Sequence, residues 1–361
     1  MGRRVVVWGT GNVGRPAIRA VASHRDLELA GVVVANPAKV GRDAGALAGI
    51  APLGVAATDD ATIARGADVD AVVYTVNADF RPAESLAEVT ACLAAGVNVV
   101  STAFYPLLHP PTAAPEIAEP VAAACAKGGA SIFVSGIDPG WALDILPLLL
   151  SGVAADIREI RVQEMFNYAL YDQPDAVRNL IGFGMPMEQL PPMLMDFSLR
   201  LVWAPMVRVL ADGLGVVLDE IETHVERRPL ARTIEVAGMG VFEAGTQGAF
   251  RFEVRGVVAG HPLLVVEHIT RIDDACAPDW PLPDAGQGVH RVVIAGRPHF
   301  EVSIHGHEDG EPGAAGGGNA TAANRIVNAI PAVCAAPPGI IHPIELPPIT
   351  GARQIRTSQG S

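Results

Sequence analysis

Three glycines near the N-terminus have the spacing of a phosphate-binding turn. The segment Gly9-Thr10-Gly11-Asn12-Val13-Gly14 follows a β-branched run and precedes a helical pattern, and a second strand-like run spans Leu29 to Ala35. In this context Gly9 allows a tight turn, Gly11 lets backbone amides approach a pyrophosphate, and Gly14 lets helix and strand pack closely. The spacing therefore predicts a dinucleotide site with its pyrophosphate at the helix N-terminus.

The residues after the second predicted strand indicate which dinucleotide is bound. NAD sites usually carry a carboxylate here for the ribose hydroxyls, whereas this chain reads Ala35-Asn36-Pro37-Ala38-Lys39-Val40-Gly41-Arg42. Asn36 is neutral, and Lys39 and Arg42 have the charge to pair with a 2′-phosphate. We expect NADP to be favoured, with NAD as the alternative if both cations simply face solvent.

Strand-like and helical runs alternate up to residue 140. Strands are expected at 70–76, 97–102 and 130–135, and helices at 83–95 and 116–127. This alternation predicts a Rossmann domain, a doubly wound parallel sheet, over residues 1–140. Ligands of such sheets lie beyond the carboxyl ends of the strands, which places Thr75, Asn77, Ser101 and Thr102 in the cofactor site.

The pattern changes after Gly140. A helical region is expected at 175–214, followed by strand-like runs with Gly turns at 220–226, 233–237, 250–258, 263–271, 291–294 and 300–304. We predict a second α+β domain over 141–318, built on an open, mostly antiparallel sheet. A helix at 319–334 is free to pack back on the first domain, and 352–361 reads as a disordered tail. One face of an open sheet needs a partner, so a homodimer through this domain is expected.

Polar and aromatic residues gather at the junction and in the first strand of the second domain. Asp138 lies in Gly136-Ile137-Asp138-Pro139-Gly140-Trp141, which is either a plain turn or a wall facing the cofactor. Glu164 and Tyr168 are candidate acid–base groups at the end of a strand, although the same residues suit a strand end packed on a core. The candidate substrate pocket consists of Trp141, Phe166, Tyr171 and His268.

Composition excludes several other classes of protein. The chain has 361 residues, 50% of them hydrophobic, and its net charge of −13 opposes nucleic-acid binding. Four cysteines without a CxxC pair, and the absence of a signal peptide or a bilayer-spanning run, favour a cytoplasmic protein. His299, His305 and His307 lack the spacing of a metal site, so no metal is expected. The binding partner that we expect is therefore a small-molecule substrate.

Motifs over nearly the whole chain resemble the actinobacterial dihydrodipicolinate-reductase-like proteins, which are related to 2,4-diaminopentanoate dehydrogenase and the native amine dehydrogenases. The segments that carry the resemblance are Val7–Gly14, Ala35–Asp43, Gly136–Trp141, Asn167-Tyr168, Arg251–Gly256, Ala277–Pro281 and Val327–Pro331. The resemblance implies a dimer and NAD(P)-dependent oxidation of an amine, or the reverse reductive amination of a ketone or aldehyde. The histidine-pair-plus-lysine motif of true dihydrodipicolinate reductases is missing, and Lys39 and Lys127 are the only lysines.

One position departs from the family pattern. The amine dehydrogenases of this group carry a Glu after the strand equivalent to 97–102, which activates ammonia or water, and Phe104 stands near that position here. Phenylalanine cannot accept a proton. Three accounts remain: Glu164 or Asp138 serves instead, Tyr105 or Tyr168 donates a proton in the reduction of a preformed imine, carbonyl or alkene, or an apolar substrate fills the space beside Phe104.

The expected function is hydride transfer at an amine or imine carbon held between Phe104, Trp141 and Tyr168. A reductase that works without ammonia is the alternative enzyme. The alternative that is not an enzyme is a sensor that binds NADP but has lost catalytic activity, since a fold does not fix a function.

Overall fold

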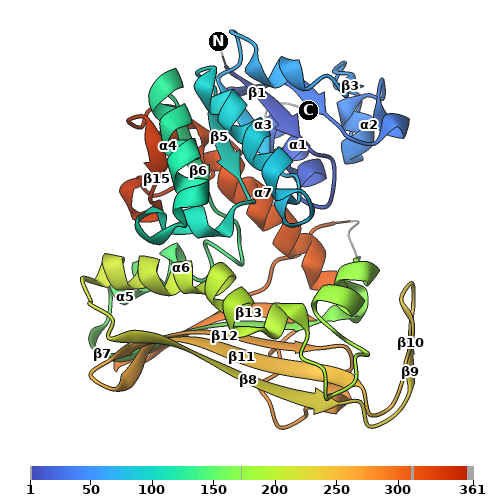
Figure 1. Ribbon diagram of the computed structural model, residues 1–361, viewed down its shortest axis with the longest axis vertical. Coiled ribbons are helices and arrows are strands. Elements are labelled where there is room, and N and C mark those ends of the chain that lie inside the picture. Colours follow the sequence, from blue (N-terminus) through green and yellow to red (C-terminus); the bar gives the residue numbers. More distant parts are fainter. Residues whose placement is uncertain (1, 172, 310–312, 356–361) are drawn as a thin grey trace. The chain divides into compact units, whose positions relative to one another are not determined.

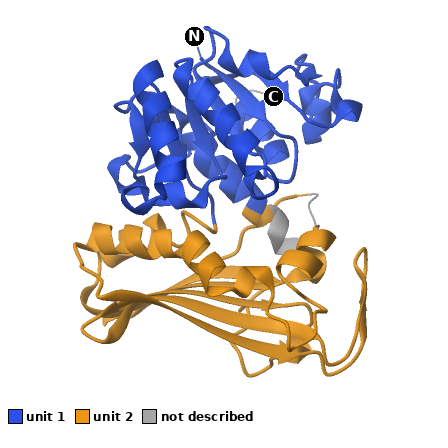
Figure 2. Cartoon of the chain, viewed as in Figure 1, with its two compact units in different colours: residues 1–137, 319–361 blue, residues 138–318 orange. Residues whose placement is uncertain are grey.

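The computed structural model describes residues 2–171, 173–309 and 313–355. The chain divides into two compact units (Figure 2): a first unit of residues up to 137 together with those from 319 onward, and a second unit of residues 138–318. The boundary predicted after residue 140 thus lies within the first residues of the second unit. None of the helices in the described ranges is long and apolar enough to cross a membrane.

The first unit is built on a seven-stranded sheet in which every neighbouring pair is parallel. The strand order is β15-β6-β5-β4-β1-β2-β3. The order in which strands are added to the sheet therefore reverses between β1 and β4, and doubly wound sheets bind their ligands at such a point. The predicted Rossmann sheet is confirmed. Its strands are β1 (Arg3–Trp8), β2 (Leu27–Val33), β3 (Ala57–Thr58), β4 (Ala71–Tyr74), β5 (Asn98–Ser101), β6 (Ser131–Val134) and β15 (Gly339–Ile341).

Helices cover both faces of this sheet (Figure 1). Side chains alternate along β1, so Val5 and Val7 pack in one core with α1 and α7, whereas Val6 and Trp8 pack in the other with α3 and α4. The helices are α1 (Gly14–Ser23), α2 (Ala44–Ala48), α3 (Pro82–Ala94), α4 (Pro115–Gly128) and α7 (Gly313–Val333). The helix expected from residue 319 therefore begins six residues earlier.

The C-terminal segment adds to the first unit in a way that the sequence did not indicate. After α7 the chain forms β15, which pairs with β6 as the edge strand. Residues 352–355, placed in the predicted disordered tail, contact this unit: Arg353 pairs with Asp26 at 3.0 Å, and Gln354 Nε2 donates to the Ala20 carbonyl. The rest of that tail, 356–361, lies outside the described residues.

The second unit is built on a six-stranded sheet of order β14-β13-β7-β12-β11-β8. Only β7 and β12 run parallel among the neighbours, so the predicted open, mostly antiparallel sheet is confirmed. The strands are β7 (Ala155–Asn167), β8 (Glu220–Pro229), β11 (Gln247–Val258), β12 (His261–Arg271), β13 (Gly288–Arg297) and β14 (Phe300–Ile304), and β9 (Ile234–Val236) and β10 (Gly240–Phe242) form a separate hairpin.

One face of this sheet is covered by helices (Figure 1). Leu199, Trp203 and Met206 of α6 (Asp196–Leu214) join a core with strand residues such as Val162 and Phe252, and α5 (Ile145–Ser151) packs beside them. The helical region expected at 175–214 was too long, because only α6 is an α-helix. The segment before it contains a short π-helix, Ala176–Leu180, and a 3₁₀-helix, Pro192–Leu194.

Candidate active site

The glycine turn of the first unit has the geometry that a pyrophosphate requires. β1 ends at Trp8 and α1 begins at Gly14, so the turn opens the helix directly. A Cβ on Gly14 would lie 2.1 Å from the Gly9 carbonyl oxygen, and Gly9 has a φ of +107°. A Cβ on Gly11 would meet nothing within 4 Å, so this part of the loop is open to a ligand. The loop fits a dinucleotide.

A cavity of about 320 Å³ lies beside this turn. It is lined by Thr10, Gly11, Asn12, Arg15, Lys39, Arg42 and Leu47. Lys39 Nζ donates to the Thr10 carbonyl and hydroxyl oxygens at 3.1 and 3.0 Å. Asn36 caps a short 3₁₀-helix by accepting a hydrogen bond from Ala38 N. Arg15 was missed by the sequence analysis, although its position directly after Gly14 was a usable signal.

The other predicted cofactor residues have mixed roles. Thr75 Oγ1 donates to the Trp8 carbonyl, and buried Ser101 Oγ donates to the Tyr74 carbonyl, so both hydroxyls tie neighbouring strand ends together. Asn77 Oδ1 accepts a hydrogen bond from Asp79 N. Val13 packs partly on the core beneath α1, and Thr102 is half-buried after β5.

Phe104 is part of the core of the first unit. Its side chain is 8% exposed and stacks on Tyr74 with the ring centroids 6.4 Å apart. Its φ of +64° is in the left-handed region, which is uncommon for a residue with a bulky side chain. Tyr105, the next residue, donates its hydroxyl to Asp79 Oδ2 at 3.2 Å.

A row of polar side chains crosses the second unit on the face that packs against α6. Glu164 of β7 lies opposite His268 of β12 on one side and opposite His290 of β13 on the other. Their neighbours on this face, such as Val162 and Phe252, belong to the apolar core. Polar residues at positions where the strand pattern calls for apolar ones were the signal in the sequence. Glu164 and His268 were predicted from the sequence, whereas His290 was not.

Two carboxylates flank His268. Its Nε2 lies 2.8 Å from Asp138 Oδ2, and its Nδ1 lies 3.5 Å from Glu164 Oε1. Glu164 also receives the Tyr168 hydroxyl at 3.2 Å, and its Oε2 lies 3.3 Å from His290 Nε2. Trp203 Nε1 donates to Asp138 Oδ1 at 2.9 Å. The sequence missed Trp203 as well, since nothing in α6 distinguishes it from a core residue.

Burial and nearby charges shift the pKa values of these groups in different directions. Burial and the nearby charge of Asp138 raise the pKa of Glu164 to about 8. Burial opposes ionisation of Asp138 too, but the charge of His268 outweighs it and lowers the Asp138 pKa. The two carboxylates raise the pKa of His268 against its burial, whereas burial lowers that of His290. The result is an Asp138–His268 ion pair beside a carboxyl group that ionises near neutral pH.

Two of the aromatic residues predicted for the pocket contact members of this group. Tyr171 stacks on Tyr168 with centroids 4.8 Å apart, and Phe166 meets His290 edge to face. Trp141 lies half-buried in the turn before α5. The predicted contact of one substrate carbon with Phe104, Trp141 and Tyr168 involves both units and stays a prediction.

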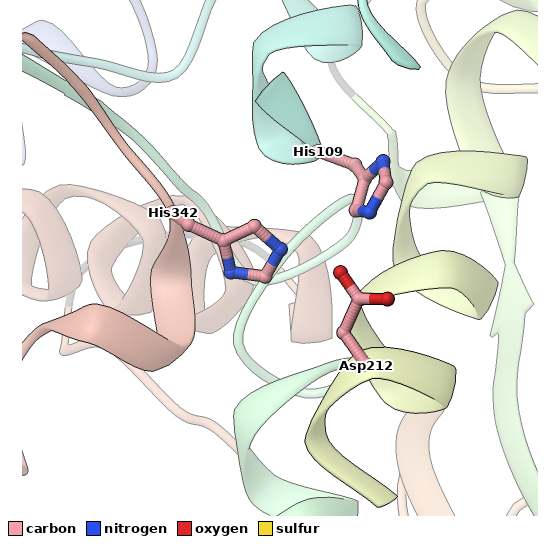
Figure 3. Close-up of side chains that lie close together, drawn as sticks. All are labelled: His109, Asp212 and His342. Carbon is pink, nitrogen blue, oxygen red and sulfur yellow. The ribbon is translucent and has the colours of Figure 1, made fainter. Parts of the chain in front are cut away.

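Histidines elsewhere have structural surroundings. His109 and His342, both in the first unit and drawn in Figure 3, meet edge to face with ring centroids 5.3 Å apart, and Asp212, also drawn there, belongs to the second unit. His305 Nε2 lies 3.0 Å from Asp284, and His307 is exposed. In the second unit Asp138, Glu164 and His268 each offer a ligand atom within 4.8 Å of the others, a spacing that a cation could also occupy.

A Rossmann sheet with an intact dinucleotide turn, followed by an α+β unit with buried ionisable groups, defines an NAD(P)-dependent oxidoreductase. Comparison with known families agrees. Residues 3–105 match the N-terminus of dihydrodipicolinate reductase, and residues 141–358 match the C-terminal domain of 2,4-diaminopentanoate dehydrogenase.

Individual relatives define the family. The chain is 53% identical over 344 residues to an amine dehydrogenase from Streptomyces virginiae, covering 95% of each chain. It is 24% identical to the 2,4-diaminopentanoate dehydrogenase of Acetoanaerobium sticklandii over 70% of this chain and 67% of that one. The amine dehydrogenase of Mycobacterium smegmatis has the same fold, with a TM-score of 0.74 at 22% identity over 98% of this chain and 99% of that chain. The protein belongs to the family of NAD(P)-dependent dehydrogenases that includes the Streptomyces enzyme.

Proposed function

We propose that this protein oxidises a primary amine to the corresponding ketone or aldehyde and ammonia with NADP⁺, and catalyses the reverse reductive amination. The observation that carries the proposal is the buried carboxyl group of Glu164 beside the Asp138–His268 ion pair. It supplies the carboxylate that Phe104 cannot supply. The names of the Streptomyces and Acetoanaerobium relatives support an amine as the substrate class.

Amine oxidation requires several proton transfers besides the hydride transfer, and two of them serve to form the C=N bond and to add water to it. The substrate ammonium must lose a proton before its nitrogen lone pair can form a C=N bond, and water that attacks this bond must lose another. The bound nicotinamide supplies the hydride acceptor, or the donor in the reverse direction. The remaining catalysis depends on groups of the protein that position the substrate and move protons.

Glu164 has the properties of the base for the attacking water. A carboxyl group with a pKa of about 8 is ionised in a substantial fraction of molecules at mildly alkaline pH. As it takes a proton from water, one water O–H bond breaks and an O–H bond forms on Glu164. The water oxygen bonds to the imine carbon while the C=N π bond breaks and its electron pair moves to nitrogen. His268, itself paired with Asp138, contacts the Glu164 carboxyl group, and the Tyr168 hydroxyl donates to the same carboxyl group and orients it.

We infer that NADP⁺ is the preferred cofactor, with NAD⁺ as the weaker alternative. The cavity beside the glycine turn is lined by Arg15, Lys39 and Arg42, and Asn36 stands where NAD sites carry a carboxylate. Cationic side chains on the lining, with the neutral Asn36 in place of the usual carboxylate, suit a 2′-phosphate.

The homodimer expected from the open sheet is part of the proposal. The sheet face that α6 leaves uncovered carries the ion pairs of Arg161 with Glu253 and Glu267, beside a small apolar cluster that includes Met165 and Trp280. A second copy on this face would therefore meet charged side chains as well as apolar ones. Sedimentation at low and high salt tests for the dimer, and a monomer at all concentrations would exclude it.

The test of the activity is reduction of NADP⁺ with a panel of primary amines and oxidation of NADPH with ketones and aldehydes, with and without ammonia. Amine-dependent and ammonia-dependent turnover is expected, with a rate that rises as Glu164 ionises near pH 8. E164Q should lose this rising limb, whereas E220Q, at an exposed position on β8, should keep it. Turnover of carbonyl or alkene substrates without ammonia would identify a reductase, and tight NADPH binding without any turnover would identify a sensor. Unchanged activity in the presence of a chelator is expected if Glu164 acts as a base rather than as a cation ligand together with Asp138 and His268.

A further inference from the structure

We propose that Asp79 and Tyr105 of the first unit form a second proton-transfer pair, which removes the proton from the substrate ammonium before hydride transfer. This inference rests on the proposed function, in which a proton must leave both the substrate ammonium and the attacking water, and Glu164 is assigned only to the water. No carboxylate stands at position 104, and Asp79 was not among the residues singled out by the sequence.

The position of the pair within the first unit is the first argument. β4 and β5 are parallel neighbours that end at Tyr74 and Ser101. Asp79 lies in the 3₁₀-helix Ala78–Phe80 after β4, and Tyr105 begins the 3₁₀-helix Tyr105–Leu108 after β5. Both residues therefore follow the carboxyl ends of adjacent strands, the edge of a doubly wound sheet where the reactive end of a dinucleotide is bound.

The contact itself is the second argument. Tyr105 Oη donates to Asp79 Oδ2 at 3.2 Å, so the phenol and the carboxylate already share a proton path. Asn77 fixes the loop by accepting a hydrogen bond from Asp79 N at 2.9 Å. Arg81, two residues further along the chain, pairs with Glu88 at 2.5 Å rather than with Asp79. Partial burial raises the pKa of Asp79 although its side chain reaches solvent, and Tyr105 opposes that shift.

The backbone at Phe104 is the third argument. Its left-handed conformation turns the side chain into the core, where it stacks on Tyr74. The chain then reverses so that the next side chain, Tyr105, is half-buried and directed to Asp79. A strained conformation for a bulky residue persists where the surrounding structure requires it, and such positions are frequent at functional sites. The turn thus delivers a phenol where the family pattern delivers a carboxylate.

The step balances without any further reactant. Tyr105 Oη takes a proton from the substrate ammonium while its own proton passes to Asp79 Oδ2. One N–H bond and one O–H bond break, and two O–H bonds form. The lone pair left on nitrogen forms the C=N bond as the hydride leaves the substrate carbon to which this nitrogen is bonded. In reductive amination the pair returns the proton to nitrogen.

The first experiment follows the ionisation of Tyr105 and does not depend on turnover. The chain has four tyrosines, and burial raises the pKa of Tyr74, of Tyr168 and of Tyr171, the last to about 12. The tyrosinate absorbance that is present in the alkaline titration of the wild type and missing in that of Y105F isolates the Tyr105 hydroxyl among these four residues. NADP⁺, with its positively charged nicotinamide, should shift the Tyr105 titration to lower pH relative to NADPH. In the cofactor-free protein D79N should also shift it to lower pH, because the variant removes the negative charge beside the phenol.

The second experiment compares variants kinetically. D79N and Y105F should lower kcat by about 100-fold, the lower end of what proton-transfer groups contribute, and leave the Kd for NADP⁺ unchanged. D79E, which keeps the carboxylate, should recover part of the loss. D60N is the matched control, because Asp60 also bonds a hydroxyl, that of Thr62 at 2.7 Å, after a strand of the same sheet. It should retain wild-type kcat and pH dependence.

Two results would overturn the inference. One is a Tyr105 titration that responds equally to NADP⁺ and NADPH, which would place the phenol away from the nicotinamide. The other is wild-type kcat in D79N and Y105F with active wild-type protein. Absence of any amine-dependent turnover in the wild type would count against the proposed function alone, because the titration with the two cofactor forms would still decide the placement of the pair.

Discussion

His268 Nε2 lies 2.8 Å from Asp138 Oδ2 while its Nδ1 lies 3.5 Å from Glu164 Oε1, so one imidazole separates two buried carboxyl groups. An imidazolium between two carboxylates can neutralise only one of them. Asp138 keeps its charge, since its pKa is lowered by His268 despite burial, and Glu164 retains its proton to about pH 8. The arrangement stores one proton beside an ion pair, which is how enzymes keep a carboxylic acid ready near neutral pH.

The first prediction concerns stability against pH. The Glu164 pKa is raised from 4.5 to about 8 on folding, so the folded state binds this proton more tightly than the unfolded chain does. The contribution of Glu164 to the free energy of unfolding is fully present below the unfolded pKa and is lost as pH rises through the folded one. We expect E164Q to lose less stability than the wild type between pH 4.5 and about 8, measured by urea unfolding.

The control is E220Q, because Glu220 is exposed and should leave the pH dependence unchanged. Parallel curves for wild type and E164Q would mean that the Glu164 pKa is not raised in the folded protein.

The second prediction concerns cofactor choice. Lys39 and Arg42 line the cavity beside the glycine turn, and each charge-assisted contact to a phosphate contributes about 1.5–3 kcal/mol. K39A and R42A should each weaken NADP⁺ binding by about 10-fold or more while changing the Kd for NAD⁺ much less. Arg15 lines the same cavity, and R15A should behave similarly. Isothermal titration with both cofactors measures the ratio, and a ratio unchanged in K39A/R42A would contradict NADP selectivity.

The third prediction concerns Phe104. Introducing the carboxylate of the related enzymes by F104E would place it among core residues beside Tyr74 rather than at a substrate. Loss of a buried phenylalanine alone costs about 3–5 kcal/mol, and an unpaired buried charge adds to the cost. F104E should therefore lower the melting temperature strongly without any gain in amine oxidation. F80E is the matched control, because Phe80 is 79% exposed and its replacement should change stability little. A stable F104E variant with faster amine turnover would show that position 104 faces the substrate.

The sequence predicted the parts of the structure that depend on local patterns. The Gly9–Gly14 turn, the alternation of strands and helices and the antiparallel hairpins follow from glycine positions and from periods of 2 and 3.6 residues. Strand β15 was missed because three residues after a proline pair carry no periodic signal, and their pairing with β6 is a contact across the whole chain.

The candidate site was predicted in part for the same reason. Glu164 was predicted as an acid–base candidate at a strand end and His268 as a pocket residue, but only the register of β7, β12 and β13 makes them neighbours and adds His290. Phe104 was placed at a substrate because its strand end is known from the pattern. The left-handed turn that sends its ring into the core depends on tertiary packing.

The last prediction concerns the polar face of the second sheet. Glu267 is 1% exposed, and it receives Arg161 Nη1 at 2.7 Å, Arg251 Nε at 2.5 Å and Gln163 Nε2 at 2.8 Å. Removing one partner of a buried ion pair typically costs about 3–5 kcal/mol, because the opposite charges remain desolvated. E267Q should therefore lower the urea midpoint markedly. E301Q removes a comparable contact, Glu301 to Arg291 at 3.1 Å, from a carboxylate that is 52% exposed, where a salt bridge contributes about 0–1 kcal/mol. Equal losses in the two variants would mean that the face around Glu267 is hydrated rather than buried, and in that case high salt should weaken both pairs alike.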